Sequence, residues 1–512
     1  GDNASGGTVN IITRAGDERK IGGRFVAGSY DTFKGGLSYS GSTEKLSWVF
    51  VGSYLTSSGY RDNSDTESDD IALTLGYYPA DNLKINLQGA SHKDDTNLPG
   101  ALKASDFASG IERTATLQPN DFADTDDYYI SAGPEIYFLN DSMFKLDVSL
   151  RQRSFFSFAS FAGGTFEGDT EINTLTISPQ LVIREKVWGL ENNLTFGMDY
   201  SDSEEDIHNK SLFFGFPSEG FFDLKKVNIG FYLQDDLVLS DNLALSAGFR
   251  HDRADFEFSP STPAKVDMDE NLFTVGLNYS ISEDIQLYGS YSQSFRYPLF
   301  DEIFSFFTNT VSTSLVPQTS DDYEIGLRYA VNKSFYGNIN LFRIETDDEI
   351  YLNPVVFVNE NLDGMSRRDG MEIALAWTYD RLSLRGGYTY TDAVLEEGQF
   401  AGKNVPGVPQ HKADLEARYQ FAKGFSAVLT GSYIGERSFE SDFSNAFAEQ
   451  DDYVLVNAKI MYKRDQFNGF LNLNNLTNEK YSEYGVLGGF PVEQAFYPSP
   501  EFNVMGGVTY FF

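Results

Sequence analysis

The sequence contains no cysteine and no long apolar run. Without cysteine the chain forms no disulfide, no thiolate-bound zinc site and no cysteine nucleophile. Because no stretch of about 18 apolar residues occurs, the sequence also excludes a membrane-spanning helix. It does not exclude a membrane protein, since the strands of a membrane barrel alternate apolar and polar residues and form no such run.

Basic residues are scarce, with 39 Lys and Arg against 75 Asp and Glu and a formal net charge of -36. Nucleic acid is not an expected partner, because phosphate contacts need clustered Lys and Arg. We ascribe most of the acidic residues to solvated loops. The alternative is that the acidic segments 62–67 and 94–97 bind Ca²⁺, although neither has the spacing of an EF-hand loop. We therefore expect no cofactor and keep loop-bound Ca²⁺ as the alternative.

Histidine is also scarce, and none of the four histidines is close in sequence to another. No local metal-binding motif arises from them. His251 is followed by Asp252, but neighbouring residues of a strand point to opposite faces and cannot form a catalytic pair. No nucleophile–base constellation and no glycine-rich phosphate motif is present. The sequence does not predict an enzyme.

Phenylalanine and tyrosine are abundant, with 44 and 30 copies, and apolar and polar residues alternate through most of the chain. Clear alternation runs through 144–151, 243–250, 284–291 and 338–343. Alternation with period two predicts strands that have one apolar and one polar face. Enrichment in Phe and Tyr is typical of strands and of the aromatic girdles of membrane barrels.

Short polar turns alternate along the chain with longer connections. The short turns are near 41–44, 79–82, 140–142, 240–242, 282–284, 332–334 and 464–466, and the long connections are 94–126, 155–168, 206–222, 296–319, 352–366, 396–409 and 481–500. In a hairpin meander successive turns lie at opposite ends, so one end carries tight turns and the other long loops. The breaks separate about 22 strands, an even number as such a barrel requires. We predict an all-β, transmembrane antiparallel β-barrel with short periplasmic turns and long extracellular loops.

Several segments, in this order along the chain, resemble the TonB-dependent outer-membrane receptors. Residues 3–13, NASGGTVNIIT, resemble the last strand of the plug domain in that family. The segments that resemble its barrel are 294–302, 315–329, 404–412, 474–481 and 497–500. Gln318 departs from the pattern, because the family usually has Glu there. The resemblance implies a plug remnant at 1–17, its C-terminal end, followed by a transmembrane barrel at 18–512.

The resemblance also implies a function: ligand-gated uptake of a scarce nutrient across the outer membrane of a Gram-negative bacterium. A metal chelate such as a ferric siderophore is the expected ligand, while cobalamin, haem, sugars and peptides stay open. The implied partners are outer-membrane lipid and lipopolysaccharide, the small-molecule ligand, and TonB–ExbB–ExbD acting through a plug that this chain lacks. Since a barrel of about 22 strands encloses a wide lumen, the alternatives are a plugless, porin-like conduit and a scaffold or receptor for another protein.

Phenylalanines cluster in three of the expected loops. Exposed apolar residues in a loop are unfavourable unless they bury something. The expected ligand-binding residues are Phe155, Phe156, Phe213, Phe214, Phe216, Phe304, Phe306 and Phe307. The alternative is that these loops pack on one another or are covered by a partner protein.

Overall fold

The structure is a computed structural model that describes residues 16, 19–139, 141–306, 309–331, 334–353, 358–489 and 491–512. Within these residues, 22 antiparallel strands form one closed barrel, as the alternating pattern predicts. The first and last strands close it, with Phe25 opposite Val508. The expected plug remnant, 1–17, lies outside the described residues except for Gly16.

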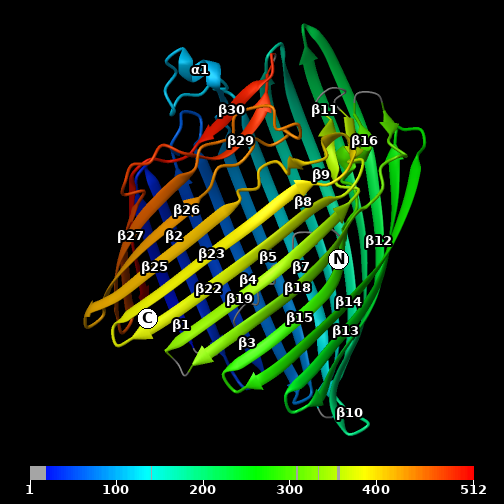
Figure 1. Ribbon diagram of the computed structural model, residues 1–512, viewed down its shortest axis with the longest axis vertical. Helices are drawn as coiled ribbons and strands as arrows, with labels where there is room; N and C mark the ends of the chain where they lie inside the picture. The colour runs from blue at the N-terminus through cyan, green and yellow to red at the C-terminus, as the bar shows by residue number, and fades with distance from the viewer. Residues whose placement is uncertain are drawn as a thin grey trace.

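The barrel strands follow one another around the wall in chain order (Figure 1). They are β1 (Lys20–Gly28), β2 (Thr32–Ser42), β3 (Leu46–Ser57), β4 (Thr66–Ala80), β5 (Leu83–Asn97), β7 (Phe122–Phe138), β8 (Ser142–Phe161), β9 (Gly164–Ile183), β11 (Leu190–Phe213), β12 (Phe216–Ser240), β13 (Leu243–Ser259), β14 (Lys265–Ser282), β15 (Ile285–Arg296), β18 (Gln318–Val331), β19 (Phe335–Asp347), β22 (Ser366–Tyr379), β23 (Leu382–Leu395), β25 (His411–Ala422), β26 (Phe425–Ile434), β27 (Tyr453–Arg464), β28 (Phe467–Asn474) and β31 (Asn503–Phe511).

Shorter elements lie mainly in the loops of one end, where Figure 1 shows α1, β29, β30 and β16. They are β6 (Leu102–Lys103), α1 (Ala104–Ala108), β10 (Lys186–Val187), α2 (Phe300–Ile303), β16 (Phe304–Ser305), β17 (Thr310–Val311), β20 (Ile350–Asn353), β21 (Val358–Asn361), the 3₁₀ turn η1 (Gly398–Phe400), β24 (Lys403–Asn404), β29 (Ser482–Gly488) and β30 (Glu493–Pro498). In the part of the chain that the structure describes, none of the helices has the length and hydropathy that a membrane-spanning helix needs.

Two of the expected long loops are strands instead. Segments 155–168 and 206–222 belong to two long hairpins: β8 and β9 have 20 residues each, and β11 and β12 have 24 and 25. The turn of the second hairpin is Phe214–Gly215, both with positive φ (47° and 85°), the conformation of a type I′ turn. The loop prediction was wrong for these segments. Membrane strands are recognised by alternating apolar and polar residues, and this alternation is lost where a strand extends beyond the membrane and both of its faces contact water.

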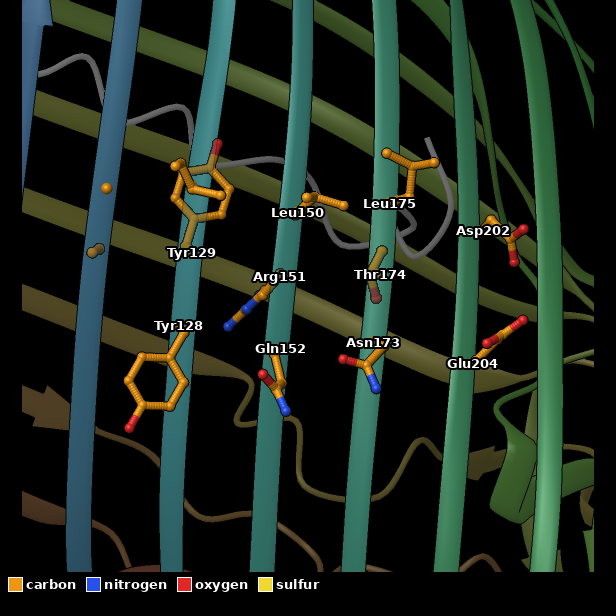
Figure 2. A pocket seen from close by; sticks show the side chains of 13 residues that line it. Tyr128, Tyr129, Leu150, Arg151, Gln152, Asn173, Thr174, Leu175, Asp202 and Glu204 are labelled. Carbon is orange, nitrogen blue, oxygen red and sulfur yellow. The ribbon is translucent and has the colours of Figure 1, made fainter.

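The barrel wall presents a band of apolar side chains to the outside, and on β7, β8, β9 and β11 the edge of this band nearest the hairpin tips can be located. One outward row, read by cross-strand partners, is Ile130–Leu150–Leu175–Asp202, and the next row toward the hairpin tips is Tyr128–Gln152–Asn173–Glu204. Figure 2 shows Leu150, Leu175 and Asp202 of the first row and all four residues of the second. Both rows line a depression of ≈ 710 Å³ in the wall. The change from leucine and isoleucine to amides and carboxylates marks where the strands leave the hydrocarbon region. Residues beyond Glu204 on β11 therefore lie outside the membrane.

The largest buried cluster lies inside the barrel, where the connection between β15 and β18 folds against the inner face of β11–β14. Its buried members are Ile207, Phe222, Leu224, Ala254, Phe256, Phe258, Met268, Phe295, Tyr297, Ile303, Phe304, Val311 and Leu315. This aromatic packing fixes the connection, and the connection in turn forms one wall of the site described next.

Candidate ligand-binding site

The projecting parts of β8, β9, β11 and β12 present an aromatic and polar surface to the inside of the barrel. One inward row across these strands is Phe155–Thr170–Ile207–Phe222, and the next row outward is Ser157–Gly168–Asn209–Gly220. The glycines leave space that neighbouring rings occupy. A Cβ on Gly220 would lie 2.6 Å from the Phe222 ring, and one on Gly168 3.1 Å from the Phe166 ring.

The connection between β15 and β18 faces this surface. Its short helix α2 begins after Leu299, whose backbone N–H donates to the Glu302 carboxylate at 2.7 Å. Further along, the Phe306 ring packs edge to face on Phe222 with 5.0 Å between centroids. Between the strands and the connection lies a cleft of ≈ 760 Å³, which we call the vestibule cleft. Its size and mostly apolar walls are typical of small-molecule sites.

A buried polar network anchors the connection to the wall below the cleft. Asp252 on β13 has no solvent exposure and accepts hydrogen bonds from Arg250 Nε at 2.9 Å and Asn228 Nδ2 at 2.8 Å. The hydroxyl of Tyr297, also without exposure, lies 3.4 Å from the same carboxylate. Buried charges are stabilised when paired and hydrogen-bonded in this way, and the network holds the start of the connection in one position.

The charged groups in the vestibule cleft are carboxylates. Glu205 on β11 and Asp301 on α2 both line it. Burial, followed by the negative charge of Asp301, raises the pKa of Glu205. Partial burial, followed by the charge of Glu302, raises the pKa of Asp301 although part of its surface stays exposed. These two carboxylates, each with a raised pKa, give the cleft an electronegative part beside its aromatic rings and uncharged polar side chains.

The predicted binding phenylalanines are distributed over four different environments. Phe155 and Phe306 line the vestibule cleft. Phe304 is 2% exposed and belongs to the buried cluster. Its position agrees with the alternative that the loop residues pack on one another. Phe156 shares the outward register and packs on Phe122 with 5.6 Å between centroids.

The remaining predicted phenylalanines lie away from the cleft or outside the described residues. Phe213, Phe214 and Phe216 form the exposed tip of the β11–β12 hairpin, with exposed fractions of 54%, 68% and 78%. Phe307 lies outside the described residues. A role for any of the eight in binding stays a prediction.

Sequence reasoning missed Glu205, Asp301, Phe166 and Phe300, all of which line the cleft. Strand register would have found the strand residues. Inward-facing residues of one strand are spaced by two, and this spacing places Phe155 of β8 and Phe166 of β9 on the inner face. Asp301 and Phe300 carried no such signal, because an irregular connection between strands has no fixed period.

Metal ligands do not gather in the described residues: no group of three or more His, Asp or Glu side chains is placed to hold an ion there. The acidic segments 62–67 and 94–97 do meet, since Glu67 is the cross-strand partner of Asp95. Binding of Ca²⁺ by them stays a prediction. His251 bonds Asn271 on the outward face at 3.0 Å, while Asp252 points inward, so the two are on opposite faces as expected.

Comparison with known proteins identifies the class. A family model described as TonB dependent receptor-like, beta-barrel, matches residues 16–476. The chain therefore belongs to the TonB-dependent receptor family, a family of outer-membrane receptors and transporters of Gram-negative bacteria.

Individual relatives cover different shares of this chain. An uncharacterized TonB-dependent receptor of Haemophilus influenzae is 25% identical over 277 residues, 50% of this chain and 78% of that protein. The ferrioxamine receptor of Yersinia enterocolitica is 28% identical over 267 residues, 49% of this chain but 36% of the receptor. The unliganded ferric citrate transporter FecA superposes with a TM-score of 0.86 over 100% of this chain and 81% of FecA, at 17% identity. The structural likeness concerns the fold.

Proposed function

We propose that this protein takes up an iron chelate, such as a ferric siderophore, across the outer membrane, with energy supplied by TonB. The observation that carries the proposal is the vestibule cleft: ≈ 760 Å³ of aromatic-walled space, inside the barrel and on the far side of the apolar band from the tight turns. A ligand arriving from outside the cell meets this space before the membrane-spanning part of the lumen. The relative named as a ferrioxamine receptor supports iron chelates as the ligand class.

The cleft suits a chelate better than a simple ion. Ligand sites of a few hundred to 1,000 Å³ enclose molecules of drug size, and aromatic walls bury their apolar parts. A hydrated metal ion would need convergent oxygen ligands instead. Movement of the ligand onward would require a plug to be displaced, which is the step that the TonB system would drive.

The test is iron supply in cells that lack other iron receptors and express the native full-length protein. We expect uptake of ⁵⁵Fe from at least one ferric siderophore, and loss of that uptake when TonB is deleted. Uptake that persists without TonB, together with ion conductance of the purified protein in planar bilayers, would favour a passive conduit. No uptake of any chelate, with a second protein co-purifying at equal amount, would favour a scaffold.

A further inference from the structure

The charge of the vestibule cleft limits the charge of its ligand. The inward-facing carboxylates of the lining are Glu205 and Asp301, whereas Glu219 lies on the outward face at its rim, and no Lys, Arg or His among the described residues contributes to the lining. A polyanionic ligand entering the cleft would meet like charges in a partly desolvated space, where electrostatic repulsion is stronger than in water.

Basic side chains near the cleft are engaged elsewhere. Lys226 faces inward on β12 opposite Ser203 and lies 5.2 and 5.1 Å from the ring centres of Phe256 and Tyr297. Arg296 donates from Nη1 to Glu302 at 2.7 Å, at the base of α2. His208 bonds Glu219 at 2.8 Å, and its ring stacks on Phe221 on the outward face of the hairpin. Arg296 and His208 thus each have a carboxylate partner other than Glu205, and Lys226 lies against aromatic rings.

Glu205 itself has no partner among the residues that the structure describes. Within the described residues its carboxylate makes no hydrogen bond and no ion pair, although its neighbour Glu204 pairs with Lys225 at 2.7 Å on the opposite, outward face. The cation in the inward row of Glu205 is Arg153, which lies two strands away, opposite Asp127. A half-buried carboxylate without a partner is unfavourable unless a ligand supplies the compensating charge or a hydrogen-bond donor.

Aromatic rings complete the arrangement. Phe155, Phe300 and Phe306 line the same cleft as the two carboxylates. Ring faces attract ammonium groups, and a carboxylate beside them adds a charge-assisted hydrogen bond. The cleft thus combines the two elements that recognise an alkylammonium group with an apolar wall for the rest of the ligand.

We propose that the vestibule cleft selects cationic or neutral chelates and rejects polyanionic ones, with Glu205 and Asp301 receiving an ammonium or other hydrogen-bond donor of the ligand. The proposal rests on the proposed function, because it specifies the charge of the chelate that the same cleft would bind.

The experiment measures the Kd of the purified full-length protein for chelates that share an iron core and differ in charge. Ferrioxamine B carries a free ammonium, its N-acetyl form is neutral at that position, and its N-succinyl form carries a carboxylate. Ferric dicitrate and a ferric tris-catecholate complete the panel as polyanions. We expect the ammonium form to bind about tenfold more tightly than the succinyl form, and the polyanions to bind more weakly than either.

Glu205→Gln and Glu204→Gln form a matched pair of variants, because the two residues are adjacent and face opposite sides. Glu205→Gln should bring the Kd of the ammonium form close to that of the acetyl form, and Glu204→Gln should leave the charge preference unchanged. Tightest binding of a polyanion, or equal effects of the two variants, would overturn the charge proposal and leave iron-chelate uptake standing. Absence of binding by every ferric chelate would overturn the proposed function itself, and the charge proposal with it.

Discussion

The Tyr297 hydroxyl lies 3.4 Å from the carboxylate of Asp252, and neither side chain has any solvent exposure. The two residues belong to different parts of the barrel: Asp252 is on β13, and Tyr297 directly follows the end of β15. Lys226 also lies 5.1 Å from the centre of the Tyr297 ring. The contact therefore fixes the first turn of the connection that forms one wall of the vestibule cleft.

Removing this anchor should loosen the connection before it unfolds the barrel. Tyr297→Phe deletes one hydrogen bond to a charged group, and we expect a loss of about 1.5–3 kcal/mol in the local stability of the connection. Proteolysis of the connection between β15 and β18 in the purified protein measures that loss. Asp252→Ala should cost more, about 3–5 kcal/mol, because it leaves Arg250 buried with less compensation. Equal cleavage rates in the wild type and both variants would show that the contact between Tyr297 and Asp252 does not hold the connection in place.

Neighbouring phenylalanines on β8 should differ in their effect on binding. Phe155 faces the cleft, whereas Phe156 packs on Phe122 outside. Burying a phenylalanine ring against a ligand is worth about 1.5–3 kcal/mol, so Phe155→Ala should raise the Kd of the tightest chelate about 10- to 100-fold. Phe156→Ala serves as the control and should leave the Kd within a factor of about two. The reverse result would place the ligand elsewhere than in the cleft.

The sequence predicts the barrel well, because its evidence is repeated in every strand. Period-two alternation and the succession of short and long connections recur along the whole chain, and closure through β1 and β31 satisfies the even strand count. The boundaries of the projecting hairpins were not predictable in the same way. At positions such as Glu205 and Asp206, both faces of β11 are polar, so the pattern resembles a loop.

The candidate site was predictable only in part. Aromatic enrichment pointed to Phe155 and Phe306, but composition alone could not separate them from the outward Phe156 or the buried Phe304. That separation depends on strand register and on where the connection after β15 folds. Glu205 of β11 and Asp301 of α2 lie in the same cleft and their charges interact. The sequence could not predict this proximity, because neither periodicity nor spacing relates residues so far apart in the chain.

Binding of an ammonium-bearing chelate should weaken as the pH is lowered from neutral into the acid range, and the loss should begin at a higher pH than ordinary carboxylates would give. Ordinary Asp and Glu carboxylates protonate near pH 4. Burial and the facing Asp301 raise the pKa of Glu205, and burial and Glu302 raise that of Asp301 against the smaller opposing effect of Arg296. Both groups thus become neutral at a higher pH than ordinary carboxylates, and their attraction for a cation is lost there.

The control for the pH series is the neutral N-acetyl chelate, whose Kd should change little over the same range. Glu205→Gln should flatten the pH dependence of the ammonium form. Because the raised pKa values mean that the folded state binds these protons more tightly, their contribution to folding stability is greatest at acid pH and falls as the pH rises through them. Stronger binding of the ammonium form at acid than at neutral pH would contradict the role of the carboxylates.

Gly220 should be intolerant of even a methyl group. A Cβ at this position would lie 2.6 Å from the Phe222 ring, which is 4% exposed and held between Phe304 and Phe306 at centroid distances of 5.5 and 5.0 Å. Since the ring cannot move away, Gly220→Ala should cost about 1–3 kcal/mol, as overpacking usually does. It should also displace Phe306 and weaken chelate binding.

Gly431→Ala on β26 is the matched control, because a Cβ there meets nothing within 4 Å. Thermal unfolding, followed by the change in gel mobility of the heated protein, compares the two variants. Combining Gly220→Ala with Phe222→Leu should restore part of the lost stability, since the smaller side chain leaves room for the methyl group. Recovery of stability without recovery of binding would mean that the Phe222 ring supports the cleft through its contacts with Phe306, and not only by filling space.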